Sequence, residues 1–260
     1  MQTDPIRLEV RGATAHLILN RPDKRNALNG AMWGSIPVLL ERALTHHDVR
    51  LLVVSGTGGS FAAGADISEF EEVYATPERA EAYSRSIAKA LDTLAAFPRP
   101  TLAMIEGACV GGGCGLALAC DLRFAAEGSR FGITPGKLGL VYTLNDTARL
   151  IRAVGVPVAK DMLFSGRLLD AGEALSIGLI NRLVPADRLS GEVEAYASLL
   201  KATSPNSAKI TKQLIALVEA GQAEDDDATR ALFLEAFSSA DFQEGYRAFL
   251  EKRTPEFGKG

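Results

Sequence analysis

The segment IEGACVGGGCGLALACDLRFAA, residues 105–126, decides the fold. The apolar residues 101–106 and 122–126 at its two ends have the length of buried strands. Between them a run of glycines marks a tight turn, and residues 114–119 form a short apolar helix. A strand, a glycine turn, a helix and a second strand make one α/β unit. The segment therefore predicts an α/β fold.

The chain on either side of this segment predicts further elements of the same kinds. Short strands over 6–10 and 14–19 open it as a hairpin, and the apolar run 51–56 is a strand buried on both faces. Helical spacing covers 26–45, where Pro37 is expected to kink or break the helix. The sequence Thr76-Pro77-Glu78 combines an N-cap, a first-turn proline and an acid, so it begins a helix that reaches about Ala96.

From residue 145 onward the pattern is mainly helical, interrupted by a short segment at 181–184. Helices are expected over 148–154, 159–164, 170–177, 188–202, 204–220, 225–238 and 241–252. We therefore predict an α/β core over residues 1–200 and a helical C-terminal region over residues 201–260.

Composition excludes several classes of protein. The chain has 260 residues, 47% of them hydrophobic, and a net charge of -4, which fits a folded protein and argues against a nucleic-acid or acidic-lipid partner. The apolar stretch 101–120 contains Glu106 and five glycines, so it is a poor membrane span. The N-terminus lacks the features of a signal peptide. We therefore expect a soluble, cytoplasmic protein whose three cysteines are reduced and buried.

Two glycine-bearing turns are the sequence features that indicate a possible catalytic site. FAAGADI (61–67) and GACVGGGC (107–114) each lead from a strand toward a helix, so their backbone N–H groups can approach a ligand closely. Two such turns could donate to one oxygen as an oxyanion hole, which is worth several kcal/mol to a transition state. Either turn alone is better explained by tight packing. The three histidines lie in a strand or at a helix end, and neither histidine catalysis nor a metal site is expected.

Six segments resemble, in order and spacing, the crotonase (enoyl-CoA hydratase/isomerase) family, and the resemblance covers almost the whole chain. They are LNRPDKRNAL (19–28), GGSFAAGADISEF (58–70), IEGACVGGGCGLALACDLRFAA (105–126), SRFGITPGKLGL (129–140), SGRLLDAGEALSIGLINRLVP (165–185) and EGYRAFLEKRTPEF (244–257). The resemblance implies a spiral of repeated ββα units with a helical C-terminal region that forms homotrimers, often paired into hexamers.

The same resemblance implies an acyl-CoA thioester as substrate, a place in fatty acid metabolism, and no cofactor besides the CoA of the substrate. It assigns the oxyanion donors to the backbone N–H groups of Ala65 and Gly112. It also implies a set of CoA-binding residues, of which the last two are often contributed by a neighbouring subunit: Lys24, Arg25, Ala27, Ala63, Asp66, Ile67, Phe249 and Lys252.

The chain departs from the family pattern at two positions. Family hydratases carry one glutamate directly after GGGC, where this chain has Gly115, and another in the segment after the FG strand, where it has Pro135. Neither residue can act as an acid or a base. Asp146 could be a substitute base, although an aspartate at a helix start more commonly caps the helix.

The segment TPGKLGLVY (134–142) is similar to the T-P-x-x-L-G-x-x-Y pattern of the family's methylmalonyl-CoA decarboxylases. Loss of carbon dioxide produces a thioester enolate without a base, and an oxyanion hole would stabilise it. The hydroxyls of Thr134 and Tyr142 are therefore candidate catalytic groups, with Tyr142 equally well explained as a buried structural tyrosine. The decarboxylases have a histidine where this chain has Ala65.

Three functional hypotheses follow. The leading one is decarboxylation of a malonyl-type acyl-CoA through a stabilised enolate. The second is enoyl-CoA hydration or isomerisation with a non-standard acid or base such as Asp146. The third is a CoA-thioester-binding subunit without turnover, because a degenerate active site would also lack both glutamates.

Overall fold

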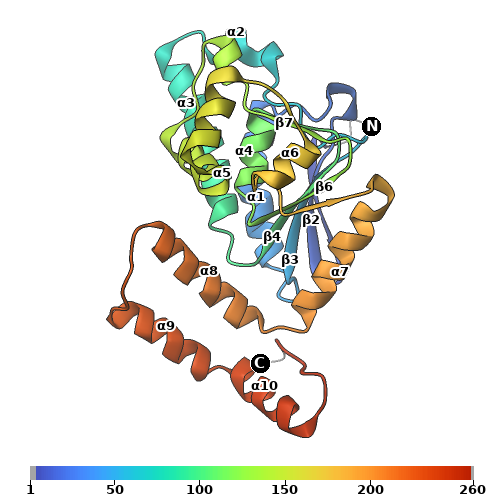
Figure 1. Ribbon diagram of the computed structural model, residues 1–260, viewed down its shortest axis with the longest axis vertical. Coiled ribbons are helices and arrows are strands. Elements are labelled where there is room, and N and C mark those ends of the chain that lie inside the picture. Colours follow the sequence, from blue (N-terminus) through green and yellow to red (C-terminus); the bar gives the residue numbers. More distant parts are fainter. Residues whose placement is uncertain (1–3, 259–260) are drawn as a thin grey trace.

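The main sheet contains six strands in the order β1-β2-β3-β4-β6-β9 (Figure 1), in a computed structural model that describes residues 4–258. β1 pairs with β2 in antiparallel fashion, and every later pair in this sheet is parallel. This arrangement confirms the predicted α/β class. The strands are β1 Ile6–Arg11, β2 Thr14–Leu19, β3 Leu51–Gly56, β4 Thr101–Ile105, β6 Leu122–Ala126 and β9 Arg182–Val184.

A second sheet of three short strands lies beside the first. It consists of β5 (Ala108–Val110), β7 (Arg130–Gly132) and β8 (Leu169–Asp170), with β5 parallel and β8 antiparallel to β7. β7 contains the FG strand that the family resemblance implies. β5 and β8 were not predicted, because runs of two or three residues are too short to show alternation. The second sheet matters for function, since β5 leads directly into the glycine turn.

The helices cover both faces of the main sheet (Figure 1). Leu189, Val193 and Ala197 of α7 pack on one face against apolar residues of β3, β4 and β6, and the larger core fills the other face. As predicted, β3 is buried on both faces from Leu51 to Ser55. The helices of this part are α1 Gly30–Leu44, α2 Phe70–Val73, α3 Pro77–Ala95, α4 Gly112–Leu118, α5 Leu144–Ser165, α6 Ala171–Ser176 and α7 Leu189–Lys201.

Two helices differ from their sequence predictions. α1 continues through Pro37, which is buried in its middle, so the expected break is absent and the packing of the apolar face outweighs the lost backbone hydrogen bond. The two helices expected over 148–154 and 159–164 are parts of α5. They are separated by Gly155, whose φ of 75° and ψ of 163° lie outside the helical region. The N-cap Thr143 accepts a hydrogen bond from the Asp146 amide and starts α5 earlier than predicted.

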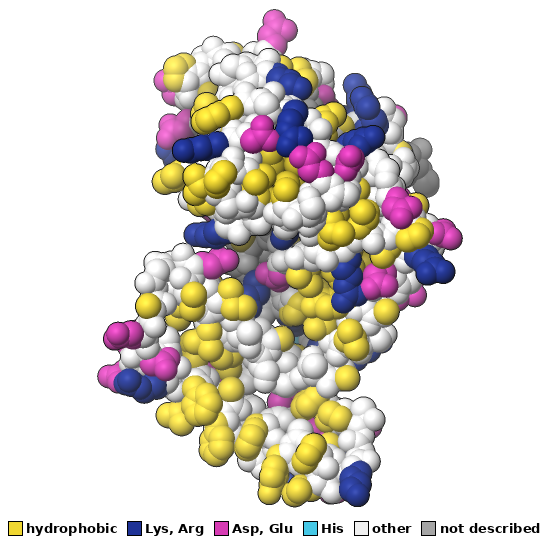
Figure 2. All heavy atoms as spheres, in the orientation of Figure 1, with side chains coloured by type: hydrophobic (Ala, Val, Ile, Leu, Met, Phe, Trp, Pro, Cys, Tyr) yellow, Lys and Arg dark blue, Asp and Glu magenta, His cyan; other side chains and the backbone are white. Residues whose placement is uncertain are grey.

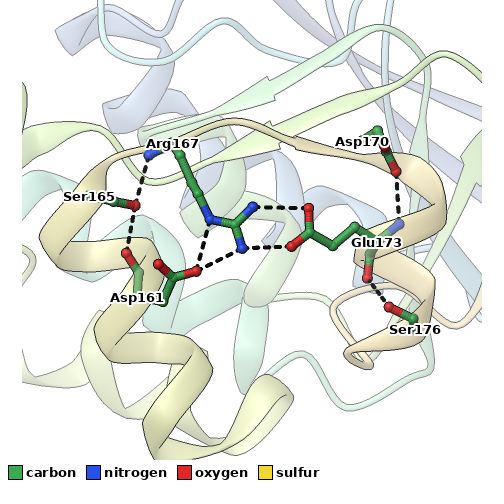
Figure 3. A network of polar contacts seen from close by, with 6 residues as sticks. All are labelled: Asp161, Ser165, Arg167, Asp170, Glu173 and Ser176. Atoms are coloured by element: carbon green, nitrogen blue, oxygen red, sulfur yellow. Dashed lines mark hydrogen bonds and ion pairs between the residues drawn. The ribbon is translucent and has the colours of Figure 1, made fainter.

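The turn between α5 and α6 is fastened by one guanidinium group (Figure 3). Arg167 donates to Asp161 over 2.8 Å and to both carboxylate oxygens of Glu173 over 3.0 and 2.6 Å. These two carboxylates hold the pKa of Arg167 above its ordinary value. In this turn Leu168 packs closely against Gly132, where a Cβ atom would lie 2.6 Å from the Leu168 Cδ2 atom. The network therefore fixes the end of β7, from which the Thr134 segment follows.

Helices α8 (Pro205–Glu219), α9 (Asp227–Phe237) and α10 (Ala240–Glu251) extend from the sheet at the bottom of Figure 1. Lys212 of α8 binds the Asp121 carboxylate over 2.8 Å, and Asp121 also accepts the backbone N–H and the hydroxyl of Thr101. Figure 2 shows apolar side chains gathered on this part of the surface. In these helices, Phe233 of α9 is 67% exposed and Phe249 of α10 is 82% exposed. The domain boundary near residue 200 and the trimer stay predictions.

No helix within residues 4–258 combines the length and the apolar character that a bilayer span requires. The cysteines Cys109, Cys114 and Cys120 are buried free thiols, as predicted. Burial raises the pKa of the Cys120 thiol to about 12, so this thiol stays protonated and packs as a small apolar group.

Candidate active site

The turn that carries Ala65 is held by a single bridge to Leu28. The Leu28 N–H donates to the Gly64 carbonyl, and the Asp66 N–H donates to the Leu28 carbonyl, both over 2.8 Å. These two hydrogen bonds flank Ala65 in a parallel bridge. In this geometry the N–H of the flanked residue points away from the opposite strand. The N–H of Ala65 therefore faces away from Leu28.

Gly112 is the first residue of α4, so its N–H has no partner within the helix. The residue before it, Gly111, has a φ of 52° and a ψ of -119°, a conformation that favours glycine. At Gly113 a Cβ atom would lie 2.5 Å from the carbonyl oxygen of Ala62, so glycine alone lets α4 approach the first turn. The two glycine turns are thus packed backbone against backbone.

This packing brings the two predicted donors together. A Cβ atom on Gly112 would lie 3.7 Å from the amide nitrogen of Ala65. Within the described chain, neither the Ala65 N–H nor the Gly112 N–H donates to a protein acceptor. Two unpaired N–H groups side by side can both donate to a single carbonyl oxygen of a ligand.

Trp33 of α1 forms one wall behind Gly112. Its Cζ2 atom would lie 3.2 Å from a Cβ atom at residue 112, and the side chain is fully buried. Burial raises the pKa of the Tyr83 hydroxyl, on α3, to about 12. The nearby indole N–H of Trp33 lowers this pKa by a smaller amount. Neither polar atom has a hydrogen-bond partner of good geometry in the described chain. Sequence reasoning missed Trp33 because nothing in its helical pattern connects it with residue 112.

The predicted CoA-binding loop lies against the Ala65 turn. The Ala63 N–H donates to the Arg25 carbonyl over 3.0 Å, and the buried Asn26 amide donates to the Ser60 carbonyl over 2.6 Å. Arg25 and Asn26 have φ values of 47° and 56°, which turn the loop sharply. The side chains of Lys24 and Arg25 are exposed beside this turn, where they are free to meet an anion.

Asp66 is buried and its carboxylate is already bound within the protein. It accepts the Ser68 hydroxyl and the Arg21 guanidinium, both over 2.7 Å. The hydrogen bond from Ser68 above all, together with Arg21, lowers the pKa of Asp66 to about 2. Arg21 also donates to the Ala27 carbonyl over 2.7 Å, so it clamps the two loops together. Sequence reasoning did not find Arg21, whose partner is 45 residues away.

The remaining CoA-binding candidates lie in two different places. Ile67 is 60% exposed at the start of the short helix after the Ala65 turn. Phe249 and Lys252 belong to the end of α10, at the opposite end of the molecule from α2 and α3 (Figure 1). One chain therefore does not bring Phe249 and Lys252 to the Ala65 turn.

Gly115 and Pro135 stand at the two positions where the family resemblance predicts a glutamate in hydratases. Gly115 lies inside α4, and a Cβ atom there would lie 3.8 Å from the Tyr142 hydroxyl oxygen, so the position has room. Pro135 begins the short helix over Pro135–Leu138. Asp146 stands in the first turn of α5, where it accepts the Thr143 hydroxyl over 2.8 Å. Its other oxygen binds Arg149 over 3.0 Å, which agrees with the helix-start interpretation.

The two candidate hydroxyls flank Gly111. The Tyr142 hydroxyl contacts the Gly111 carbonyl oxygen over 2.6 Å, and burial raises the pKa of this phenol well above its ordinary value. The Thr134 hydroxyl oxygen would lie 3.7 Å from a Cβ atom on Gly111. Both hydroxyls therefore adjoin the glycine turn that carries the Gly112 N–H.

Other parts of the described chain do not compete with this site. Residues 4–258 contain no cluster of three or more His, Cys, Asp or Glu side chains that could hold a metal. A cavity of about 650 Å³ lies between α8 and the core, lined among others by Leu118, Tyr196 and Lys212. Its lining includes neither Ala65 nor Gly112, so we assign the chemistry to the glycine turns.

Comparison with known proteins agrees with this site. Residues 9–260 match the family model described as Enoyl-CoA hydratase/isomerase. The chain is 35% identical over 246 residues to the 2,3-dehydroadipyl-CoA hydratase of Escherichia coli, and the aligned region covers 93% of each chain. It is 33% identical to the short-chain-enoyl-CoA hydratase of Clostridium acetobutylicum over 261 residues, 98% of each chain.

A solved structure of an enoyl-CoA hydratase/isomerase family protein from Hyphomonas neptunium is similar throughout. It is 48% identical, covers 97% of each chain and superposes with a TM-score of 0.95. The particular similarity of residues 134–142 to decarboxylases is not among these matches and stays a prediction. With its two glycine turns, its fold and its full-length relatives, this chain belongs to the enoyl-CoA hydratase/isomerase family.

Proposed function

We propose that the protein acts on acyl-CoA thioesters by stabilising a thioester enolate between the N–H groups of Ala65 and Gly112. The observation that carries this proposal is that these two N–H groups lie close together and neither donates to an acceptor in the described chain. The amide nitrogen of Ala65 lies 3.7 Å from the Cβ position of Gly112. Negative charge develops on the thioester oxygen as an enolate forms. Two fixed donors favour this state over the neutral thioester, and this difference accelerates the reaction.

We assign recognition of the CoA group to the two loops beside this hole. Lys24 and Arg25 supply exposed cations for the phosphates, and the backbone of Ala27, Ala63 and Ile67 lines the same place. Asp66 acts through its bonds to Ser68 and Arg21, which hold the loops in position. In a homotrimer or hexamer, Phe249 and Lys252 of a neighbouring copy would complete the CoA site.

Decarboxylation of a malonyl-type thioester is the reaction that the residues favour. The bond between the α carbon and the carboxylate breaks, its electron pair enters the enolate, carbon dioxide leaves, and water supplies a proton to the α carbon. This sequence requires no base, in keeping with Gly115 and Pro135. We assign orientation of the departing carboxylate to the Thr134 hydroxyl, which lies 3.7 Å from the Cβ position of Gly111.

Hydration of an enoyl-CoA is the second candidate, and the names of the relatives favour it. Water would add to the β carbon, and the same enolate would then take a proton at the α carbon. Such a reaction needs a group that activates water. Asp146 is the acid that the sequence offers for this role, and its two oxygens are held by Thr143 and Arg149. Double-bond isomerisation through the same enolate would also need a base.

Product analysis separates these candidates. The purified protein is incubated with methylmalonyl-CoA, crotonyl-CoA or a 3-enoyl-CoA, in H₂O and in D₂O, and the products are followed by mass spectrometry. We expect methylmalonyl-CoA to give propionyl-CoA with one deuterium at the α carbon in D₂O. Hydration of crotonyl-CoA that persists in Asp146→Ala, with methylmalonyl-CoA untouched, would contradict decarboxylation. Binding of all three thioesters without any reaction or exchange would identify a non-catalytic subunit.

The Ala65→Pro substitution tests the hole itself. It removes one N–H that makes no protein hydrogen bond and places the proline Cδ where this N–H pointed, so the donor is lost and the hole is narrowed without the loss of a protein hydrogen bond. We expect kcat to fall by about 10²- to 10³-fold, the usual effect of losing one oxyanion donor. Circular dichroism checks that the variant is folded. A folded variant with unchanged kcat would contradict the assignment.

A further inference from the structure

The hydroxyl of Tyr142 makes a short contact with the backbone of the glycine turn. Its oxygen lies 2.6 Å from the carbonyl oxygen of Gly111. A carbonyl oxygen can only accept, so the Tyr142 hydroxyl must donate its proton in this hydrogen bond. The Gly111 carbonyl also accepts the Gly115 N–H over 3.0 Å, as the first bond of α4.

The Gly111 carbonyl and the Gly112 N–H belong to the same peptide unit. In a trans peptide these two groups point in opposite directions, and resonance couples them through the C–N bond. A proton held at the carbonyl oxygen draws electrons toward oxygen and makes the N–H a stronger donor. Tyr142 therefore acts on the side of the peptide opposite to the proposed oxyanion hole.

We propose that Tyr142 is a positioning residue, which orients and polarises the Gly111–Gly112 peptide so that the Gly112 N–H binds the thioester oxygen more strongly. This inference rests on the proposed function and adds a residue to it.

Local geometry explains why this peptide needs such a restraint. Gly111 has no side chain to limit its backbone, and its φ of 52° and ψ of -119° lie outside the regions that ordinary residues favour. Its own N–H is held by the Gly132 carbonyl over 2.8 Å, which leaves the next peptide to be fixed from its carbonyl side. The Gly115 N–H and the Tyr142 hydroxyl both do this. The hydroxyl reaches the carbonyl from the space beside Gly115, where a longer side chain at residue 115 would displace it.

The neutral phenol is suited to this role over the whole physiological pH range. Burial raises the pKa of Tyr142, and the nearby Cys114 and Asp146 raise it further. The hydroxyl consequently keeps the proton that it donates to Gly111. A proton donor to the substrate would instead need a hydroxyl proton that is free and more acidic.

The test uses a probe that cannot react. In the ketone analogue acetyl-dethia-CoA, a methylene group replaces the thioester sulfur, and its carbonyl carbon is labelled with ¹³C. Isotope-edited infrared spectroscopy measures the carbonyl stretching frequency of the bound probe in the wild-type protein, in Tyr142→Phe and in Tyr196→Phe. Tyr196 is a matched control because it lies on α7, with its ring against Phe124 and away from the glycine turns.

We expect the wild-type protein and Tyr196→Phe to lower the carbonyl frequency equally, relative to the probe in water. In Tyr142→Phe the frequency should return part of the way toward the value in water. With a substrate that is turned over, kcat should fall about tenfold and KM should change less than about twofold. This loss is smaller than the one for removing a donor outright, because the Gly112 N–H remains.

A carbonyl frequency in Tyr142→Phe equal to that of the wild type would overturn the proposal, even if activity were lost. A wild-type protein that binds the probe without lowering its frequency would overturn the proposed oxyanion hole itself, which separates the two failures. If Tyr142→Phe does not fold, 3-fluorotyrosine at residue 142 replaces it. Its more acidic hydroxyl should lower the bound carbonyl frequency beyond the wild-type value, and an unchanged frequency would again overturn the proposal.

Discussion

Gly113 and Gly115, two residues apart in α4, have different structural requirements. A Cβ atom on Gly113 would lie 2.5 Å from the Ala62 carbonyl oxygen, whereas one on Gly115 meets its nearest neighbours at 3.8 Å. Gly113 is needed for the contact between the two turns that places Ala65 beside Gly112. Gly115 is not required by packing, so the absence of a side chain there leaves space for the Tyr142 hydroxyl.

This difference gives a prediction for a matched pair of variants. Gly115→Ala should raise the free energy of unfolding by about 0.5–1 kcal/mol, because alanine restricts the unfolded chain and favours the helix. Gly113→Ala should lower the free energy of unfolding by about 1–3 kcal/mol, because the backbone must move. Urea denaturation followed by circular dichroism measures both values. Equal effects of the two substitutions would contradict the packing described for α4.

At the level of single residues, the sequence identified the two proposed donors but not the residues that support them. Ala65 and Gly112 were identified through a family resemblance, and the structure places them side by side. Arg21 and Trp33 were missed because their partners are distant in the chain and no local pattern reports such contacts. Tyr142 was identified as a hydroxyl of interest, but its contact with the Gly111 carbonyl depends on how the loop folds back.

At the scale of elements, two loops form the site only if they are held together. Arg21 binds the Ala27 carbonyl and the Asp66 carboxylate, so it joins the predicted CoA-binding loop to the Ala65 turn. The Asp66 side chain is only 8% exposed, so water screens this ion pair weakly. The role of this ion pair is to hold the two loops in a fixed position relative to each other.

The pH dependence of stability tests this clamp. The pKa of Asp66 is lowered from 3.8 to about 2, so its contribution is present above pH 4 and is lost as the pH falls through 2. At pH 7, Asp66→Asn should lower the free energy of unfolding by about 2 kcal/mol, since hydrogen bonds to a charged group are lost. The difference from the wild type should shrink between pH 4 and pH 2, as measured by urea denaturation. The exposed Asp48→Asn serves as the control, and a difference for Asp66→Asn that is independent of pH would contradict this account.

Elements with a strong local signal were predicted well. The strands over 14–19 and 51–56 agree with the structure because each is a short apolar run bounded by turn residues. The strands β5 and β8 were missed, since their pairing is defined by distant partners and not by their own composition. At Pro37 the helix does not break, because burial of α1 stabilises the continuous helix.

At the scale of the whole molecule, α8, α9 and α10 present more apolar surface than one chain needs. Phe233, Leu234 and Phe237 follow one face of α9, and each is more than half exposed. Exposed apolar residues that cluster in this way usually cover a partner. Phe249 and Lys252 lie in the same region, so assembly would also decide whether the CoA site is complete.

We predict that the protein is a trimer, or a hexamer built from trimers, when its mass is measured by light scattering after size-exclusion chromatography. Leu234→Glu should release monomers, because a charge would be buried in the interface. Ala228→Glu adds the same charge on another face of α9 and should leave the mass unchanged. A wild-type monomer, or an assembly that withstands Leu234→Glu, would contradict this model of the C-terminal helices.

A crystal structure of the protein with acetyl-dethia-CoA bound tests the central claim most directly. We predict that the carbonyl oxygen of the ligand lies about 2.7–3.1 Å from the amide nitrogens of both Ala65 and Gly112. A bound ligand whose carbonyl oxygen contacts neither amide, or only side chains, would contradict the oxyanion hole on which the account depends.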